Sequence, residues 1–116
     1  MVDSKQKGKR YERWVCRWWH ELTGRDVRRT AAVAPDLDNA GIDLIGTGLW
    51  VVQCKAVERS IDVHSILERM PIDAGVNVVL HKRSNRGTAV SMSLEDFAYV
   101  LSCMEHKTVQ PITTAN

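Results

Sequence analysis

Apolar residues near the start of the chain recur at helical spacing. They lie on one helical face and are Tyr11, Trp14, Val15, Trp18, Trp19 and Leu22. The spacing predicts an amphipathic helix over roughly Lys7–Thr23. Gly24 follows directly and is expected to end this helix.

Short apolar and β-branched runs fill the middle of the chain. They predict strands at Asp26–Thr30, Ile42–Ile45, Leu49–Lys55, Val76–His81 and Thr88–Met92. Gly46-Thr47-Gly48, between the second and third runs, is typical of a β-hairpin turn. Residues 31–41 contain several turn formers and are expected to be irregular.

Two helices are predicted in the second half of the chain. Asp62 can cap a helix over His64–Met70. Ser93, followed three residues later by Asp96, opens a last helix that reaches about Glu105. The elements then follow in the order αβββαββα, which predicts an α/β fold with a mixed sheet flanked by helices.

Length and composition narrow the class of protein. The chain has 116 residues and a mass of 13.1 kDa, which predicts one domain over residues 1–116, with flexible tails at 1–6 and 108–116. It is 44% hydrophobic and 26% charged, and neither a membrane span nor a secretory signal is expected. The three cysteines are odd in number and far apart, which is typical of reduced thiols in the cytoplasm and not of a disulfide or zinc framework.

The net charge of +2 is unevenly distributed. Residues 1–30 hold nine basic and four acidic residues, a net charge of +5, whereas residues 31–116 carry a net charge of −3. A basic first quarter suits a polyanion such as DNA, but it also suits a solvated helix face.

Four polar residues lie where packing alone would not place them. Glu12 falls at the edge of the apolar helical stripe with no basic residue three or four positions ahead, and pairing with Lys9 is the structural alternative. Asp43 interrupts the apolar run Ile42–Ile45, where the alternative is an edge strand that faces water. Alternation along the next strand places Gln53 and Lys55 on one face.

The length of the hairpin loop decides whether these groups meet. A three-residue loop opposes Asp43 to Val51 and makes Gln53 its diagonal neighbour, about 7 to 8 Å away. A two-residue loop opposes Asp43 to Val52 and separates the groups. A shared site therefore calls for the three-residue loop.

These residue types suit phosphodiester hydrolysis, which uses a hard cation held by oxygen ligands and a positive group beside the developing charge. Asp43, the side-chain oxygen of Gln53 and the backbone carbonyl of Cys54 can supply oxygen ligands. Glu12 can add direct or water-mediated coordination, and Lys55 can supply the positive charge. If Gln53 is not a ligand, the neighbouring Asp36 and Asp38 are the next candidates.

Three segments together resemble a known nuclease superfamily. Gly8–Arg13 in the first helix, Gly41–Ile45 in one strand and Val52–Lys55 in the next resemble the PD-(D/E)XK nucleases over roughly residues 7–100. The basic first helix is most similar to archaeal-type Holliday-junction resolvases, and the Gln-Cys-Lys strand is similar to Mrr-like restriction nucleases.

The resemblance implies a restriction-endonuclease-like fold and specific roles. It makes Glu12, Asp43 and Gln53 the metal site and Lys55 the catalytic lysine. Gln53 departs from the resolvase pattern, which has Glu at that position. Thr30 matches a hydroxyl residue near the resolvase site.

The expected function is that of a Mg²⁺-dependent DNA endonuclease, with Mn²⁺ as an alternative metal. The substrate is expected to be branched DNA such as a Holliday junction in DNA recombination and repair, cut by a homodimer. The residues expected to bind DNA are Lys9, Arg10, Arg13, Arg28, Arg29, Lys82, Arg83 and Arg86. The alternatives are a nicking or restriction-type nuclease that takes its specificity from a partner, and a DNA-binding protein without catalysis.

Overall fold

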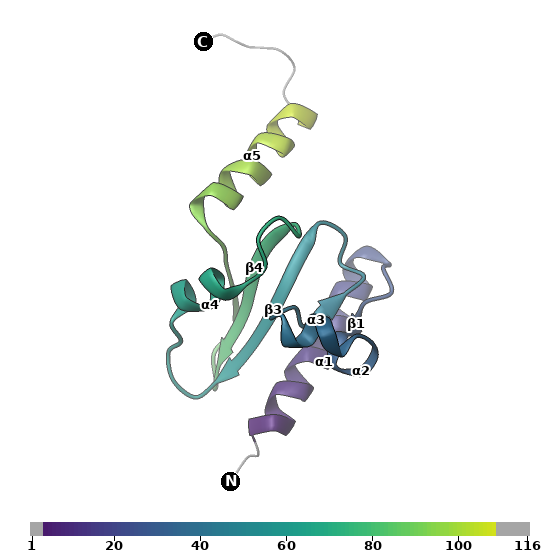
Figure 1. Ribbon diagram of the computed structural model, residues 1–116, viewed down its shortest axis with the longest axis vertical. Helices are drawn as coiled ribbons and strands as arrows, with labels where there is room; N and C mark the ends of the chain where they lie inside the picture. Colours follow the sequence, from purple (N-terminus) through teal and green to yellow (C-terminus); the bar gives the residue numbers. More distant parts are fainter. Residues whose placement is uncertain (1–3, 109–116) are drawn as a thin grey trace.

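The computed structural model describes residues 4–108, and helices cover both faces of its central sheet (Figure 1). Helix α1 (Ser4–Thr23) lies on one face and α4 (Val63–Arg69) on the other. Residues 4–6 of the expected N-terminal tail belong to α1. Residues 1–3 and 109–116 lie outside the described residues.

The central sheet has three strands in the order β3-β4-β5. Strand β3 (Trp50–Val57) pairs in parallel with β4 (Val76–Arg83), and α4 lies in the connection between them. Strand β5 (Thr88–Ser91) pairs antiparallel with β4. The predicted α/β class with a mixed sheet is therefore confirmed.

A second, two-stranded sheet lies beside the first. Its strands, β1 (Arg28–Arg29) and β2 (Leu44–Ile45), pair antiparallel, although the sequence predicted that the second strand forms a hairpin with the third. Gly46 permits this arrangement, because a side chain there would collide with the carbonyl oxygen of Asp26. Without a side chain, the loop after β2 can lie against the segment that leads into β1.

The predicted register of Asp43 is wrong. The backbone N–H of Asp43 donates to the carbonyl oxygen of Val52 at 2.8 Å, so Asp43 lies beside Val52 and not opposite Val51. Four residues, 46–49, separate β2 from β3 instead of the predicted three. Asp43 therefore does not reach the site as a diagonal neighbour of Gln53.

Residues 30–39 form two short helices where an irregular stretch was expected. Helix α2 (Thr30–Val33) is followed at once by α3 (Pro35–Asn39), which has proline in its first turn. Such short helices leave no periodic pattern that a sequence can show.

The predicted helix caps are confirmed. The carboxylate of Asp62 accepts a hydrogen bond from the N–H of Ser65 at 3.1 Å at the start of α4. The hydroxyl oxygen of Ser93 accepts one from the N–H of Asp96 at 3.0 Å at the start of α5 (Leu94–Thr108).

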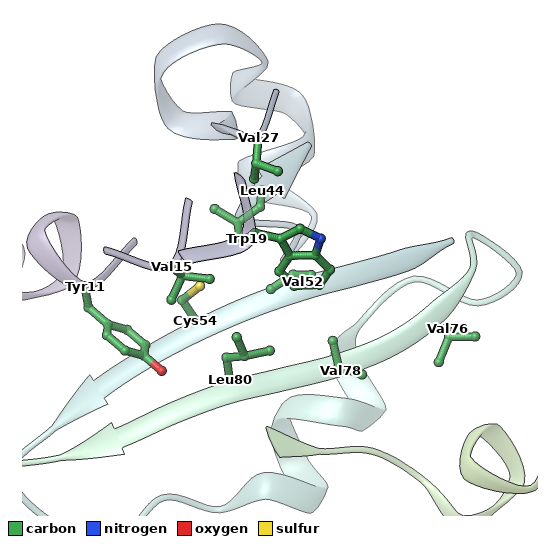
Figure 2. Close-up of a cluster of buried hydrophobic side chains, with 10 residues drawn as sticks. All are labelled: Tyr11, Val15, Trp19, Val27, Leu44, Val52, Cys54, Val76, Val78 and Leu80. Atoms are coloured by element: carbon green, nitrogen blue, oxygen red, sulfur yellow. The ribbon is translucent and has the colours of Figure 1, made fainter. Parts of the chain in front are cut away.

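Apolar side chains alternate between the two faces of β3 and β4, so each face of the sheet contributes to its own apolar cluster. On the α1 side, Figure 2 shows the helix residues Tyr11, Val15 and Trp19 against the strand residues Val52 and Leu80. A smaller cluster on the α4 side contains Val51, Val79, Ile66 and Met70. Because helices cover both faces, β3 and β4 are buried on both sides and form the rigid base of the site. Among residues 4–108, no helix is both long and apolar enough to cross a membrane.

Candidate functional site

Asp43 is fixed at the edge of β3 by three hydrogen bonds. Its N–H bonds to Val52, and its carbonyl oxygen accepts from the N–H of Thr30 at 2.9 Å. Its carboxylate oxygen Oδ2 accepts from the backbone N–H of Cys54 at 2.7 Å. The carboxylate therefore reaches β3 in spite of the unexpected register.

The surroundings of Asp43 oppose its ionisation. Burial raises the pKa of Asp43 to about 6, although the hydrogen bond from Cys54 acts in the opposite direction. The negative charges of Glu12 and Asp38 raise the pKa further, and Lys55 lowers it. A cation bound beside Asp43 would relieve this unfavourable charge.

Gln53 and Lys55 line a cavity of about 450 Å³ on the α4 side of β3, together with Arg69. Among the side chains that the structure describes, neither Gln53 nor Lys55 makes a hydrogen bond or an ion pair with protein. A half-buried amide and an ammonium group without protein partners are available to a ligand.

Gly41 leaves room for the amide of Gln53. A Cβ atom at position 41 would lie 3.3 Å from Oε1 of Gln53, and the backbone there has a φ of +88°. Both observations favour glycine, because another residue would be strained and would crowd the amide oxygen.

Glu12 projects from α1 into an ion pair with Arg29 of β1. The Arg29 Nε donates to Glu12 Oε1 at 2.8 Å, and the two side chains are only 15% and 17% exposed. The alternative pairing of Glu12 with Lys9 is therefore not the one that forms. Arg29 holds the Glu12 carboxylate close enough to Asp43 to raise its pKa.

Thr30 and Asp38 support the site from the α2 and α3 segment. The Thr30 hydroxyl is fully buried and donates to the carbonyl oxygen of Ile42 at 2.6 Å, which steadies the residue before Asp43. Asp38 brings a further negative charge near Asp43, whereas Asp36 is not among the groups that shift the pKa of Asp43. Arg69 was not anticipated, since a lone arginine at the end of a helix belongs to no motif.

The carboxylates alone do not make a metal site. Within residues 4–108, no group of three or more His, Cys, Asp or Glu side chains has the arrangement of metal ligands. A cation near Asp43 would therefore depend on an amide or backbone oxygen as well.

A second pocket, of about 460 Å³, lies between α1, the end of β3 and the turn from β4 to β5. We call it the basic pocket, and its charged and aromatic lining consists of Lys7, Arg10, Tyr11, Trp14, Lys82, Arg83 and Arg86. The Lys7 ammonium donates to Glu58 at 2.9 Å and to Ser84 at 3.0 Å, which ties α1 to the turn. Trp14 is 44% exposed and stacks on Tyr11.

The residues predicted to bind DNA separate into three groups. Arg10 joins Lys82, Arg83 and Arg86 in the basic pocket. Lys9 and Arg13 are exposed elsewhere on α1. Arg28 pairs with Asp26 at 3.1 Å and Arg29 with Glu12, so both already have a carboxylate partner.

The two pockets lie on opposite faces of the same end of β3. Lys55 lines the cavity on one face, and the next residue, Ala56, lines the basic pocket on the other. No protein-family model, curated protein or solved structure matches the chain. The function is therefore inferred from the geometry of these two pockets.

Proposed function

We propose that the protein is a metal-dependent DNA endonuclease with a restriction-endonuclease-like fold, related to the PD-(D/E)XK superfamily. The observation that carries this proposal is that the Asp43 carboxylate bonds to β3 at Cys54, the residue between Gln53 and Lys55. Asp43 is held there by the N–H of Cys54, and the other two side chains have no protein partner among the described residues.

The oxygen donors fit a hard divalent cation, Mg²⁺ or Mn²⁺. Asp43 and the amide oxygen of Gln53 would hold it, with Glu12 and the backbone carbonyl of Cys54 as further ligands. The raised pKa of Asp43 and the space that Gly41 leaves around the Gln53 amide support this assignment. When bound, such a cation polarises the phosphate and acidifies water.

In this proposal, Lys55 stabilises the negative charge that develops on the phosphate. Its ammonium group has no ion-pair partner among the described residues, so it is available to the oxygen atoms of a phosphate. A positive group at that place lowers the barrier because negative charge grows on the phosphate during hydrolysis. Arg69 lines the same cavity and would help to position the backbone of the substrate.

The basic pocket would bind the flanking phosphates of the nucleic acid. Four of its cations are arginines or lysines for which no ion-pair partner is found among the described residues: Arg10, Lys82, Arg83 and Arg86. Trp14 adds an exposed aromatic ring on which an unpaired base can stack. The continuous stacking of a duplex is interrupted at branch points, so an exposed ring in this pocket favours branched DNA such as the junctions of recombination and repair.

The test is a cleavage assay on a four-way junction, a flap and a linear duplex, with and without Mg²⁺. We expect Mg²⁺-dependent cleavage of the junction in the presence of excess linear duplex. Equal cleavage of all three substrates would instead favour a restriction-type nuclease. If the protein binds the junction but does not cleave it at any concentration of Mg²⁺ or Mn²⁺, it is a DNA-binding protein without catalysis.

A further inference from the structure

Helix α5 extends away from the sheet beyond the end of β5 (Figure 1). Leu94, Phe97, Leu101 and Met104 follow helical spacing and form a stripe that is 44 to 78% exposed. Val100, on a neighbouring side of the helix, packs against the α1-side core. The helix is therefore anchored at one point while its most apolar stripe faces solvent.

An apolar groove of about 300 Å³ lies on the same molecule. Its walls include Trp18, Trp19 and Leu22 from α1, Trp50 and Val90 from the strands, and Met92 just after β5. Leu22 is 69% exposed and Val90 is 59% exposed. Exposed apolar patches of this kind mark interaction surfaces.

The helix is held away from the groove of its own chain. Only residues 92 and 93 connect β5 to α5, and both are already engaged. Met92 packs against the core, and Ser93 caps the helix through the N–H of Asp96. Because Met92 and Val100 both pack against the α1-side core, a return of α5 onto its own groove would disturb these contacts.

We propose that α5 of one copy docks into the apolar groove of a second copy, so that two chains exchange these helices in a twofold dimer. Because each chain carries both the helix stripe and the groove, two copies satisfy both surfaces reciprocally. The inference depends on packing alone and stands whether or not the protein is a nuclease.

The size of the two surfaces suits a stable dimer. Seven apolar residues are involved, four on the helix stripe and Trp18, Leu22 and Val90 at the groove. Each exposes on the order of 100 Å², as expected for large side chains that are about half accessible. One copy therefore offers roughly 700 Å², close to the roughly 800 Å² that each partner buries in a standard interface.

Two double variants and a control test the exchange. The helix variant is Phe97→Glu with Leu101→Glu, and the groove variant is Leu22→Glu with Val90→Glu. Tyr99→Glu is the matched control, because Tyr99 is 51% exposed on the other side of α5. Sedimentation equilibrium gives the dimer dissociation constant, and circular dichroism verifies that each variant is folded.

We expect a wild-type dimer, at least a hundredfold weaker association for each double variant, and no change for the control. A mixture of the two double variants should form heterodimers, because the groove of the helix variant still accepts α5 of the groove variant. A monomeric wild type or a mixture that stays monomeric would overturn the proposal. A groove variant that still dimerises would also overturn it, because the two α5 helices would then pair directly with each other.

Discussion

The cavity beside Lys55 and the basic pocket lie on opposite faces of one strand end, but they treat charge differently. Lys55 lines the cavity and lies close enough to the buried Asp43 to lower its pKa, whereas the negative charges of Glu12 and Asp38 raise it. In the basic pocket, Lys7 alone has a carboxylate partner, among the residues that the structure describes, and the other cations are exposed. The first arrangement suits chemistry on a phosphate, and the second suits affinity for a polyanion.

The largest expected effect is the loss of cleavage on changing the cavity. Lys55→Ala should slow cleavage of junction DNA by about 10²- to 10³-fold, because a positive group that acts on developing charge is removed. Junction binding should change by no more than about twofold, since most of the affinity comes from the basic pocket. Single-turnover cleavage and binding are measured on the same labelled junction.

The matched control for this variant is Lys82→Ala, which removes the same charge from the basic pocket. It should weaken binding and leave the single-turnover rate at saturating protein unchanged. Wild-type cleavage by Lys55→Ala would remove the proposed site.

The next effect concerns the salt dependence of binding. Changing Lys82, Arg83 and Arg86 together to alanine should weaken junction binding by about 10- to 100-fold at moderate salt. It should also reduce the slope of log K against log [salt] by about 1 for each lost phosphate contact. A fluorescence-anisotropy salt series provides both values, with Arg28→Ala as the control, since Arg28 already pairs with Asp26. An unchanged slope would mean that the DNA does not bind in the basic pocket.

A smaller effect separates the roles of the oxygen ligands in the cavity. Gln53→Glu adds a negative charge at nearly the same shape, so the Mg²⁺ concentration for half-maximal cleavage should fall by about tenfold. Gln53→Ala loses the oxygen and should raise that concentration or end turnover. Metal titrations of all three proteins give the comparison. If Gln53→Ala cleaves like wild type at limiting Mg²⁺, the ligands must be sought around Asp38.

The smallest effect is on stability. Burial raises the pKa of Asp43 to about 6, above the value of an unfolded aspartate, so ionisation of this carboxyl destabilises the fold. Asp43→Asn can still accept the hydrogen bond from Cys54 and should be more stable than wild type by roughly 1 to 3 kcal/mol above pH 6, since each unit of raised pKa corresponds to about 1.4 kcal/mol.

The sign of this effect can be tested by varying pH. As pH falls from 6 toward 4, Asp43 becomes protonated in the folded state, and the advantage of Asp43→Asn should disappear. Urea unfolding at pH 4, 6 and 8 in the presence of a chelator measures it. An advantage that grows toward low pH would contradict the raised pKa.

Local sequence patterns determined most of the secondary structure. The periodic stripe of α1, the apolar run of β3 and the caps Asp62 and Ser93 each predicted an element that the structure contains. These signals are local, since each depends on residues a few positions apart. The sequence also singled out Asp43, Gln53 and Lys55, because polar groups in apolar strands are costly to bury.

The tertiary structure decided how these elements and residues meet. The lack of a side chain at Gly46 allows the close approach to Asp26 beside the pairing of β2 with β1, and the hydrogen bond from Asp43 to Val52 shows its register. The ion pair between Glu12 and Arg29 likewise joins residues 17 positions apart. The exposed stripe of α5 looks in sequence like any core-facing helix. Periodicity shows that a helix has an apolar face, but only the packing of the whole chain shows whether that face is covered.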